Sequence, residues 1–116
     1  SGEIPSAIAY LTNLEFLDLA ENKIGGMIPT EVGALKKLQE LVIKLNSISG
    51  EIPSEIGQCT ELTWVDLGGN ALQGSIPSEI GHCKGLTTLD LESNAINGTI
   101  PSEIGQCSNL VNLLLN

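Results

Sequence analysis

The sequence predicts an α/β repeat fold, a solenoid of stacked and near-identical turns that each carry a short strand. The first observation is a strict period, which repeats asparagine at Asn22, Asn46, Asn70 and Asn94. Glycine, isoleucine and proline recur with the same step, and no insertion or deletion interrupts it. Apolar and polar residues alternate before each asparagine, which is typical of a strand with one buried face. A period of this length indicates turns that bury their apolar faces against one another.

Residues 35–58 show the elements of one repeat. Its expected core positions are Leu35, Leu38, Leu41, Ile43, Ile48, Ile52 and Ile56. Leu41 and Ile43 alternate with outward residues, so we place the strand here. The Ile-Pro-Ser-Glu-Ile-Gly stretch that follows predicts an extended start and one turn of tight helix, which we expect Gly57 to end. The asparagine between these elements can donate and accept at once, so we expect its four copies to form a structural ladder along the bends.

Three cysteines, Cys59, Cys83 and Cys107, share one column of the stack with Leu11 and Leu35. A position that accepts leucine is apolar and buried, and a free cysteine packs there as a small hydrophobe. We therefore expect neither a disulfide framework nor a metal site, and no cofactor. His82 occupies the place of alanine and glutamine in other repeats, which predicts a solvated turn residue.

The composition narrows the class of partner. A formal net charge of −9 argues against nucleic acid and against an anionic membrane surface. The sequence contains no apolar stretch of about 18 residues, so we expect no transmembrane helix within it, and we expect no signal peptide in its first residues. We expect residues 1–116 to form one array, with about four full repeats, partial repeats at both ends and no caps. Open ends of this kind predict end-to-end self-association.

The outward strand positions are the candidate site for a peptide or protein partner. They vary from repeat to repeat while the core positions hardly vary. The candidates are Phe16, Asp18, Glu40, Val42, Lys44, Trp64, Asp66, Thr88, Asp90, Glu92 and Asn112. Trp64 is the strongest of them, because tryptophan is enriched at binding hot spots; the alternative is that it only covers its neighbours. The excess of carboxylates favours a cationic or neutral partner, although the aspartates also fit a purely structural role.

Two other polar features lie outside these columns. A second column of carboxylates, Glu31, Glu55, Glu79 and Glu103, is expected on a solvated face that keeps the array soluble. Asn97-Gly98-Thr99 is a glycosylation sequon in a turn, so Asn97 is a candidate glycan site. Catalysis by paired carboxylates needs a pocket that shifts one pKa, and a shallow strip provides none, so we expect no enzyme activity.

The pattern L-x-x-L-x-x-L-x-L-x-x-N-x-L-x-G-x-I-P-x-x-L-G begins at Leu11. It resembles the plant-type leucine-rich repeat, whose unit is about 24 residues long. The resemblance implies a right-handed solenoid with a parallel sheet on its concave side and short 3-10 helical segments on its convex side. It also implies a second small sheet near the G-x-I-P element. The chain departs from the pattern at Ala9, which replaces a glycine, and at Leu45, where a small or polar residue is usual. Paired-cysteine caps are absent from the sequence.

The Ile-Gly-x-Cys-x-x-Leu segments are most similar to ectodomains of plant receptor-like kinases. This likeness implies part of a longer protein, located outside the plasma membrane or secreted. It implies binding of a peptide or protein ligand and pairing with a co-receptor for signalling, with any kinase elsewhere in the parent protein. Two alternatives stay open. One is a secreted inhibitor of cell-wall-degrading enzymes, and the other is an engineered repeat scaffold.

Overall fold

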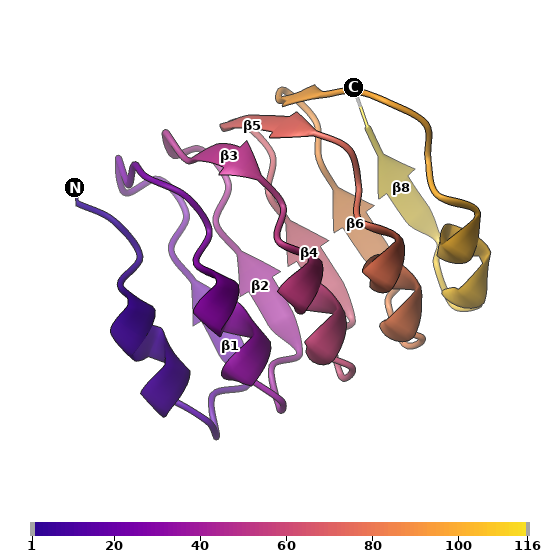
Figure 1. Ribbon diagram of the computed structural model, residues 1–116, viewed down its shortest axis with the longest axis horizontal. Coiled ribbons are helices and arrows are strands. Elements are labelled where there is room, and N and C mark those ends of the chain that lie inside the picture. The colour runs from indigo at the N-terminus through magenta and orange to yellow at the C-terminus, as the bar shows by residue number, and fades with distance from the viewer. Residues whose placement is uncertain (1, 116) are drawn as a thin grey trace.

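The computed structural model describes residues 2–115 and consists of one stack of similar turns (Figure 1). Each turn contributes one short strand to a five-stranded parallel sheet with the order β1-β2-β4-β6-β8. The strands are β1 (Phe16–Asp18), β2 (Glu40–Val42), β4 (Trp64–Asp66), β6 (Thr88–Asp90) and β8 (Asn112–Leu114). Leu41 lies opposite Leu17 and Val65, so the register of this sheet equals the sequence period. The expected repeat fold is confirmed.

Opposite the sheet, each turn carries a short 3-10 helix, seen in front of the strands in Figure 1. The helices are η1 (Ser6–Tyr10), η2 (Thr30–Ala34), η3 (Ser54–Gln58), η4 (Ser78–His82) and η5 (Ser102–Gln106). Each follows a proline with extended backbone, such as Pro53 at φ −69°. Proline suits this place because its φ is fixed and it has no N–H for the helix to satisfy.

The expectation that Gly57 ends the helix is wrong, because η3 continues to Gln58. Gly57 has another role, which concerns the neighbouring turn. A β carbon at Gly57 would lie 2.5 Å from the carbonyl oxygen of Glu79, and one at Gly81 would lie 2.6 Å from that of Glu103. Glycine is therefore needed where the backbones of consecutive turns approach each other most closely.

A second, smaller parallel sheet runs along the upper edge of the stack in Figure 1. It contains β3 (Ser49–Glu51), β5 (Ala71–Gly74) and β7 (Ala95–Ile96), as the resemblance implied. Ser49 lies opposite Ala71, so the step between paired residues is shorter here than the sequence period. These strands are therefore staggered by two residues relative to the repeat. Gly50 and Gly74, both at φ +77°, supply the left-handed backbone that this segment requires.

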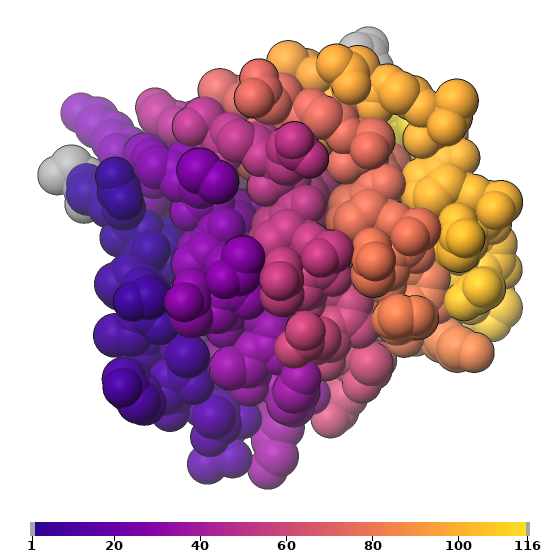
Figure 2. Space-filling view, in the orientation of Figure 1, coloured from indigo at the N-terminus to yellow at the C-terminus, as the bar shows by residue number. Residues whose placement is uncertain are grey.

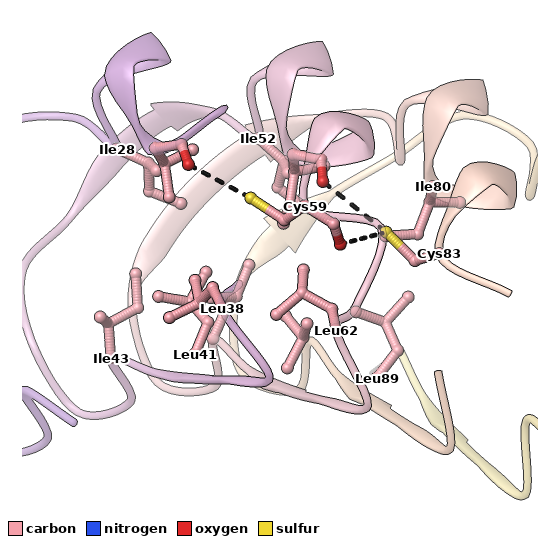
Figure 3. Close-up of a cluster of buried hydrophobic side chains, with 14 of the residues drawn as sticks. Ile28, Leu38, Leu41, Ile43, Ile52, Cys59, Leu62, Ile80, Cys83 and Leu89 are labelled. Carbon is pink, nitrogen blue, oxygen red and sulfur yellow. Dashed lines mark hydrogen bonds between the residues drawn. The ribbon is translucent and has the colours of Figure 1, made fainter. Parts of the chain in front are cut away.

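The core is a continuous column of aliphatic side chains between the large sheet and the helices, and Figure 3 shows its central part. All seven expected core positions of residues 35–58 are buried. Figure 2 shows the turns as successive bands, and helices and strands contact their counterparts in adjacent turns. Within residues 2–115, no helix is long and apolar enough to cross a membrane.

The cysteines pack in this core, as expected from their column. The Cys59 thiol lies 3.2 Å from the carbonyl oxygen of Val32, to which it donates, and the Cys83 thiol lies 3.4 Å from that of Cys59 (Figure 3). Burial raises the pKa of Cys59 to about 11 and that of Cys83 to about 12. Both groups are therefore neutral thiols at physiological pH. His82, at the end of η4, is exposed as predicted.

The asparagine amides connect consecutive turns. Oδ1 of Asn46 accepts hydrogen bonds from the backbone N–H groups of Asn22 and Ile24, both at 2.9 Å. Its Nδ2 donates to the carbonyls of Leu19 at 2.9 Å and Ile43 at 3.0 Å. Asn70 and Asn94 repeat the bonds to the two carbonyls, and their Oδ1 atoms accept the N–H groups of Ile48 and Leu72, the counterparts of Ile24. One half-buried side chain thus satisfies backbone groups of its own turn and of the turn before it.

Candidate binding face

The outward side of the five-stranded sheet is called the concave face here. In each strand the middle residue points into the core, as Leu41 and Val65 do, and the residues on either side of it point outward. The register aligns these outward residues in columns across the sheet. One column contains Phe16, Glu40, Trp64, Thr88 and Asn112, and the next contains Asp18, Val42, Asp66, Asp90 and Leu114.

Most of the predicted binding residues are accessible on this face. Phe16 is 57% exposed and Trp64 is 42% exposed, with Glu40 between them in the register. Exposed positions also include Asp18, Glu92 and Asn112, and half-buried ones include Val42, Lys44 and Asp90. The structure thus brings these residues onto one continuous surface, with Trp64 on the central strand of the five.

Two of the predicted binding residues, Thr88 and Asp66, are largely buried although they face outward. Thr88 is only 4% exposed, because it is a small residue between Trp64 and Asn112 in its column. Its hydroxyl oxygen accepts a hydrogen bond from Nδ2 of Asn112 at 3.3 Å. Asp66 is 9% exposed. The sequence shows that both face outward, but their burial depends on the sizes of neighbours in adjacent turns.

The aspartates of the face have a structural partner that the sequence analysis did not identify. Oδ1 of Asp66 accepts a hydrogen bond from the N–H of Gly68 at 3.1 Å. The same bond joins Asp90 to the N–H of Glu92 at 3.0 Å, and Asp18 to the N–H of Ala20 at 3.1 Å. Each aspartate thus fixes the backbone just after its strand with one oxygen. This arrangement follows the pattern of side-chain acceptors that bond the backbone two residues on, and the repeated Asp-x-small or Asp-x-polar spacing was its available signal.

The concave face contains a groove at the end of β4. It has a volume of about 240 Å³ and is called the glycine notch here. It is lined by Lys44, Leu45, Asp66, Gly68, Gly69, Asp90, Glu92 and Ser93. Side chains are present at the corresponding positions of the turns on both sides, and the Gly68-Gly69 pair leaves the space between them open. The sequence shows two consecutive glycines here, but the gap depends on the side chains of the two adjacent turns.

Leu45 forms one wall of the glycine notch and has an unusual backbone. Its φ is +57°, and the equivalent residues Glu21, Gly69 and Ser93 have φ between +58° and +66°. The position before each ladder asparagine is therefore left-handed in all four turns. Glycine or a small polar residue suits it, which explains why leucine departs from the repeat pattern. Leu45 is nevertheless 54% exposed, and its side chain lies over Gly69.

Other features lie away from the concave face. Asn97 is exposed directly after β7, and its backbone N–H donates to the carbonyl of Gly74 at 2.7 Å. The second carboxylate column lies on the 3-10 helices at Glu31, Glu55, Glu79 and Glu103. A groove of about 570 Å³ runs between the second sheet and these helices and includes Met27, Gly50 and Pro53. In the described part of the chain, no group of histidine, cysteine, aspartate and glutamate is arranged to hold a metal ion.

Comparisons with solved structures agree with this architecture. The crystal structure of PEPR1–AtPEP1 is 36% identical over 99% of this chain and 16% of that chain, with a TM-score of 0.96. The Arabidopsis receptor kinase HAESA, in complex with the peptide hormone IDA and the co-receptor SERK1, is 37% identical over 99% of this chain and 19% of that chain, with a TM-score of 0.93. The LRR ectodomain of SOBIR1 from Arabidopsis thaliana is 28% identical over 98% of this chain and 62% of that chain, with a TM-score of 0.89.

The chain thus spans about a sixth of the first of these structures and about a fifth of the second. A comparison with curated protein sequences returned no match. The family model of the leucine-rich repeat matches residues 13–35, 37–59, 61–83 and 85–107, which together are most of the sequence. The fold of such repeats is that of a binding module. The chain belongs to the leucine-rich repeat family.

Proposed function

We propose that this chain is a protein-binding segment of a plant receptor ectodomain and that it recognises a peptide or protein ligand through its concave face. Trp64 carries the proposal, because a large aromatic side chain is 42% exposed at the centre of an open face. Buried aromatic anchors supply much of the affinity of protein interfaces. The solved structures with TM-scores of 0.96 and 0.93 include a receptor kinase bound to a peptide hormone, which supports the same class of function.

The charge of the face defines the partner further. Asp18, Glu40 and Glu92 are exposed there, and Lys44 is a single basic residue among them. A ligand with neutral or positive groups would meet a complementary potential, whereas an anionic ligand would be repelled. We further propose that ligand binding brings the parent protein together with a second ectodomain, by analogy with the HAESA complex, which contains a peptide hormone and the co-receptor SERK1. The segment itself would act by binding, without catalysis.

Substitution of Trp64 tests the proposal. A library of random 12-residue peptides is selected on the 116-residue chain, and one selected peptide is measured by titration calorimetry. We expect Trp64→Ala to reduce the free energy of binding of that peptide by about 2 kcal/mol, which is typical for the loss of an aromatic hot-spot residue. Tyr10→Ala is the matched control, because Tyr10 is 86% exposed on η1, outside the concave face. Equal losses from both substitutions, or unfolding of Trp64→Ala, would refute the assignment of this face.

An extracellular location is the second part of the proposal. Asn97 lies in the sequon Asn97-Gly98-Thr99 and is exposed, so a glycosylating enzyme could reach its side chain. We expect expression through a plant secretory pathway to add a glycan that a peptide N-glycosidase removes. Thr99→Ala should abolish the added mass, whereas Ser75→Ala, on the neighbouring turn, should leave it unchanged. A secreted chain without this added mass would contradict the use of Asn97.

A further inference from the structure

The glycine notch interrupts an otherwise continuous row of side chains on the concave face. In the preceding turn the corresponding positions hold Lys44 and Leu45, and in the following turn they hold Glu92 and Ser93. Between them, Gly68 and Gly69 contribute no side chains, and a space of about 240 Å³ results. This volume is large enough to receive one long side chain of a ligand that lies on the face.

Two carboxylates from neighbouring strands converge on this space. Asp66 lies directly opposite Asp90 in the register. A β carbon on Gly68 would be 3.3 Å from Oδ1 of Asp66 and 3.5 Å from Oδ1 of Asp90, so both reach the same point of the notch. Among residues 2–115, neither carboxylate is paired with a lysine. Lys44 also lines the notch but forms no ion pair with either of them.

Asp66 gives the most specific indication of a ligand, because its carboxylate has little contact with solvent and forms no ion pair with a described residue. The residue is 9% exposed, and its Oδ1 accepts the N–H of Gly68. Oδ2 accepts no hydrogen bond from the described residues. No fully buried side-chain oxygen among the described residues lacks a partner, so Oδ2 keeps some contact with solvent, and Asp66 is one of the residues that line the notch. A largely buried carboxylate is stabilised when a cation pairs with it.

Leu45 adds an apolar wall beside these carboxylates. Its side chain is 54% exposed, and a β carbon on Gly69 would lie 2.7 Å from its Cδ2. The backbone of Leu45 is left-handed at φ +57°, which costs stability for leucine. An apolar wall above an acidic floor matches a side chain that has an aliphatic stem and a cationic head.

We propose that the glycine notch is a subsite for a basic side chain of the peptide or protein ligand, with arginine favoured over lysine. The inference rests on the proposed binding function of the concave face. The guanidinium of arginine is planar and donates several hydrogen bonds in fixed directions, so it can bridge two acceptors on strands about 4.8 Å apart. Its three methylene groups would lie against Leu45. The ammonium of lysine is a compact charge and would pair with fewer of these oxygens at once.

Selection of peptides tests the inference. The probe is the same random 12-residue library, selected on the native chain and on the variant Asp66→Asn/Asp90→Asn. Asparagine keeps the Oδ1 acceptor for the backbone N–H, so this variant removes the charge with little change of shape. We expect arginine, and less so lysine, to be enriched among peptides selected on the native chain. The double variant should lose this enrichment.

Synthetic peptides then give the magnitude. In one selected peptide the arginine is replaced by citrulline, which has the same shape and no charge. We expect binding to the native chain to weaken by at least about ten-fold, and binding to Asp66→Asn/Asp90→Asn by less than about two-fold. Glu79→Gln/Glu103→Gln is the matched control, because it makes the same change of charge on η4 and η5. This control should keep the full ten-fold effect.

The outcomes separate the inference from the function on which it rests. Selected peptides without basic residues, or an effect of citrulline that is the same on the double variant, would overturn the notch subsite and leave the binding function intact. Failure to select any peptide would overturn the binding function and the subsite together. Gly68→Lys provides a second variant, since its own ammonium would occupy the notch. It should weaken binding of both peptides by filling the notch, and that of the arginine peptide more, because the new ammonium also repels the guanidinium.

Discussion

The side-chain amide of Asn70 donates a hydrogen bond to the carbonyl oxygen of Ile43, 3.0 Å away and 27 residues earlier in the chain. The same nitrogen donates to the carbonyl of Leu67 at 3.1 Å, within its own turn. Oδ1 of Asn70 accepts the N–H of Ile48 at 3.0 Å. One side chain therefore closes its own turn and holds the preceding turn against it.

Replacement of Asn70 by alanine should destabilise the chain by about 1–3 kcal/mol, because partly buried backbone groups of two turns would lose their partner. The free energy of unfolding is measured by urea titration of both proteins. Asn109→Ala is the control, because Asn109 is an exposed turn residue. If the two substitutions cost the same, the ladder does not stabilise the stack.

Gly57→Ala tests the close approach of consecutive helices. The added β carbon would be 2.5 Å from the carbonyl oxygen of Glu79, and a backbone atom cannot easily move away. We expect a loss of about 1–3 kcal/mol, as overpacking of a tight contact causes. Gly105 occupies the same column, and no atom lies within 4 Å of its β-carbon position. Gly105→Ala should therefore leave stability unchanged or raise it slightly, because alanine restricts the unfolded chain. Equal thermal shifts for the two variants would contradict this account.

Leu45→Gly should stabilise the protein, in contrast to most substitutions of an apolar residue. Glycine adopts a φ of +57° without the steric penalty of a β carbon, which is about 1–2 kcal/mol for other residues. Loss of the contact with Gly69 reduces the gain, so we expect about 1 kcal/mol in urea unfolding. Lys44→Gly, one residue earlier and outside the left-handed region, should destabilise instead. Leu45→Gly also removes a wall of the glycine notch. The variant should therefore be more stable than the native chain and bind the arginine peptide more weakly.

The cysteine column predicts a decline of stability at high pH. Burial raises the pKa of Cys59 and Cys83 from the ordinary value of 9.0 to about 11 and about 12. The folded chain therefore keeps its protons where the unfolded chain releases them. The contribution of the two protonated thiols to the free energy of unfolding is complete below pH 9, and it is lost as the pH rises through their pKa values in the folded chain. The free energy of unfolding, measured by urea titration, should fall less steeply above pH 9 for Cys59→Ala/Cys83→Ala than for the native chain. All other ionisable groups are the same in both proteins, so the difference between them isolates the thiols.

Reaction with a thiol reagent provides an independent check of the same burial. At pH 8 the folded chain should react slowly at Cys59 and Cys83, because both are neutral and enclosed. Unfolding in urea should make both react at the rate of free cysteine. Rapid labelling of the folded protein would place these residues outside the core.

The properties that depend on one turn could be predicted from the sequence, because one repeat contains all the residues that determine them. Alternation placed Leu41 and Ile43 inward, and a column shared with Leu35 placed Cys59 in the core. The properties that depend on contact between turns were harder to predict from the sequence. The sequence shows glycine at position 57, but only the distance to the backbone of Glu79 reveals why glycine is required there.

The candidate site shows the same division. The outward direction of Asp66 and Thr88 follows from the strand pattern, whereas their burial follows from the side chains of the adjacent strands. The glycine notch exists because two empty positions in one turn lie between occupied positions in two others. The stagger between Ser49 and Ala71 likewise depends on how turns stack, so the sequence period alone gives no sign of it.

Trp64 is the single tryptophan of the chain, and it is partly exposed on the concave face two residues before Asp66 in β4. The indole fluorescence of the native protein therefore originates from one known place on that surface. A ligand that covers Trp64 would remove water from the ring and shift its emission to shorter wavelength, whereas a ligand on the helical side would leave the spectrum unchanged. The protein thus carries an intrinsic optical probe that can locate a binding partner without chemical labelling.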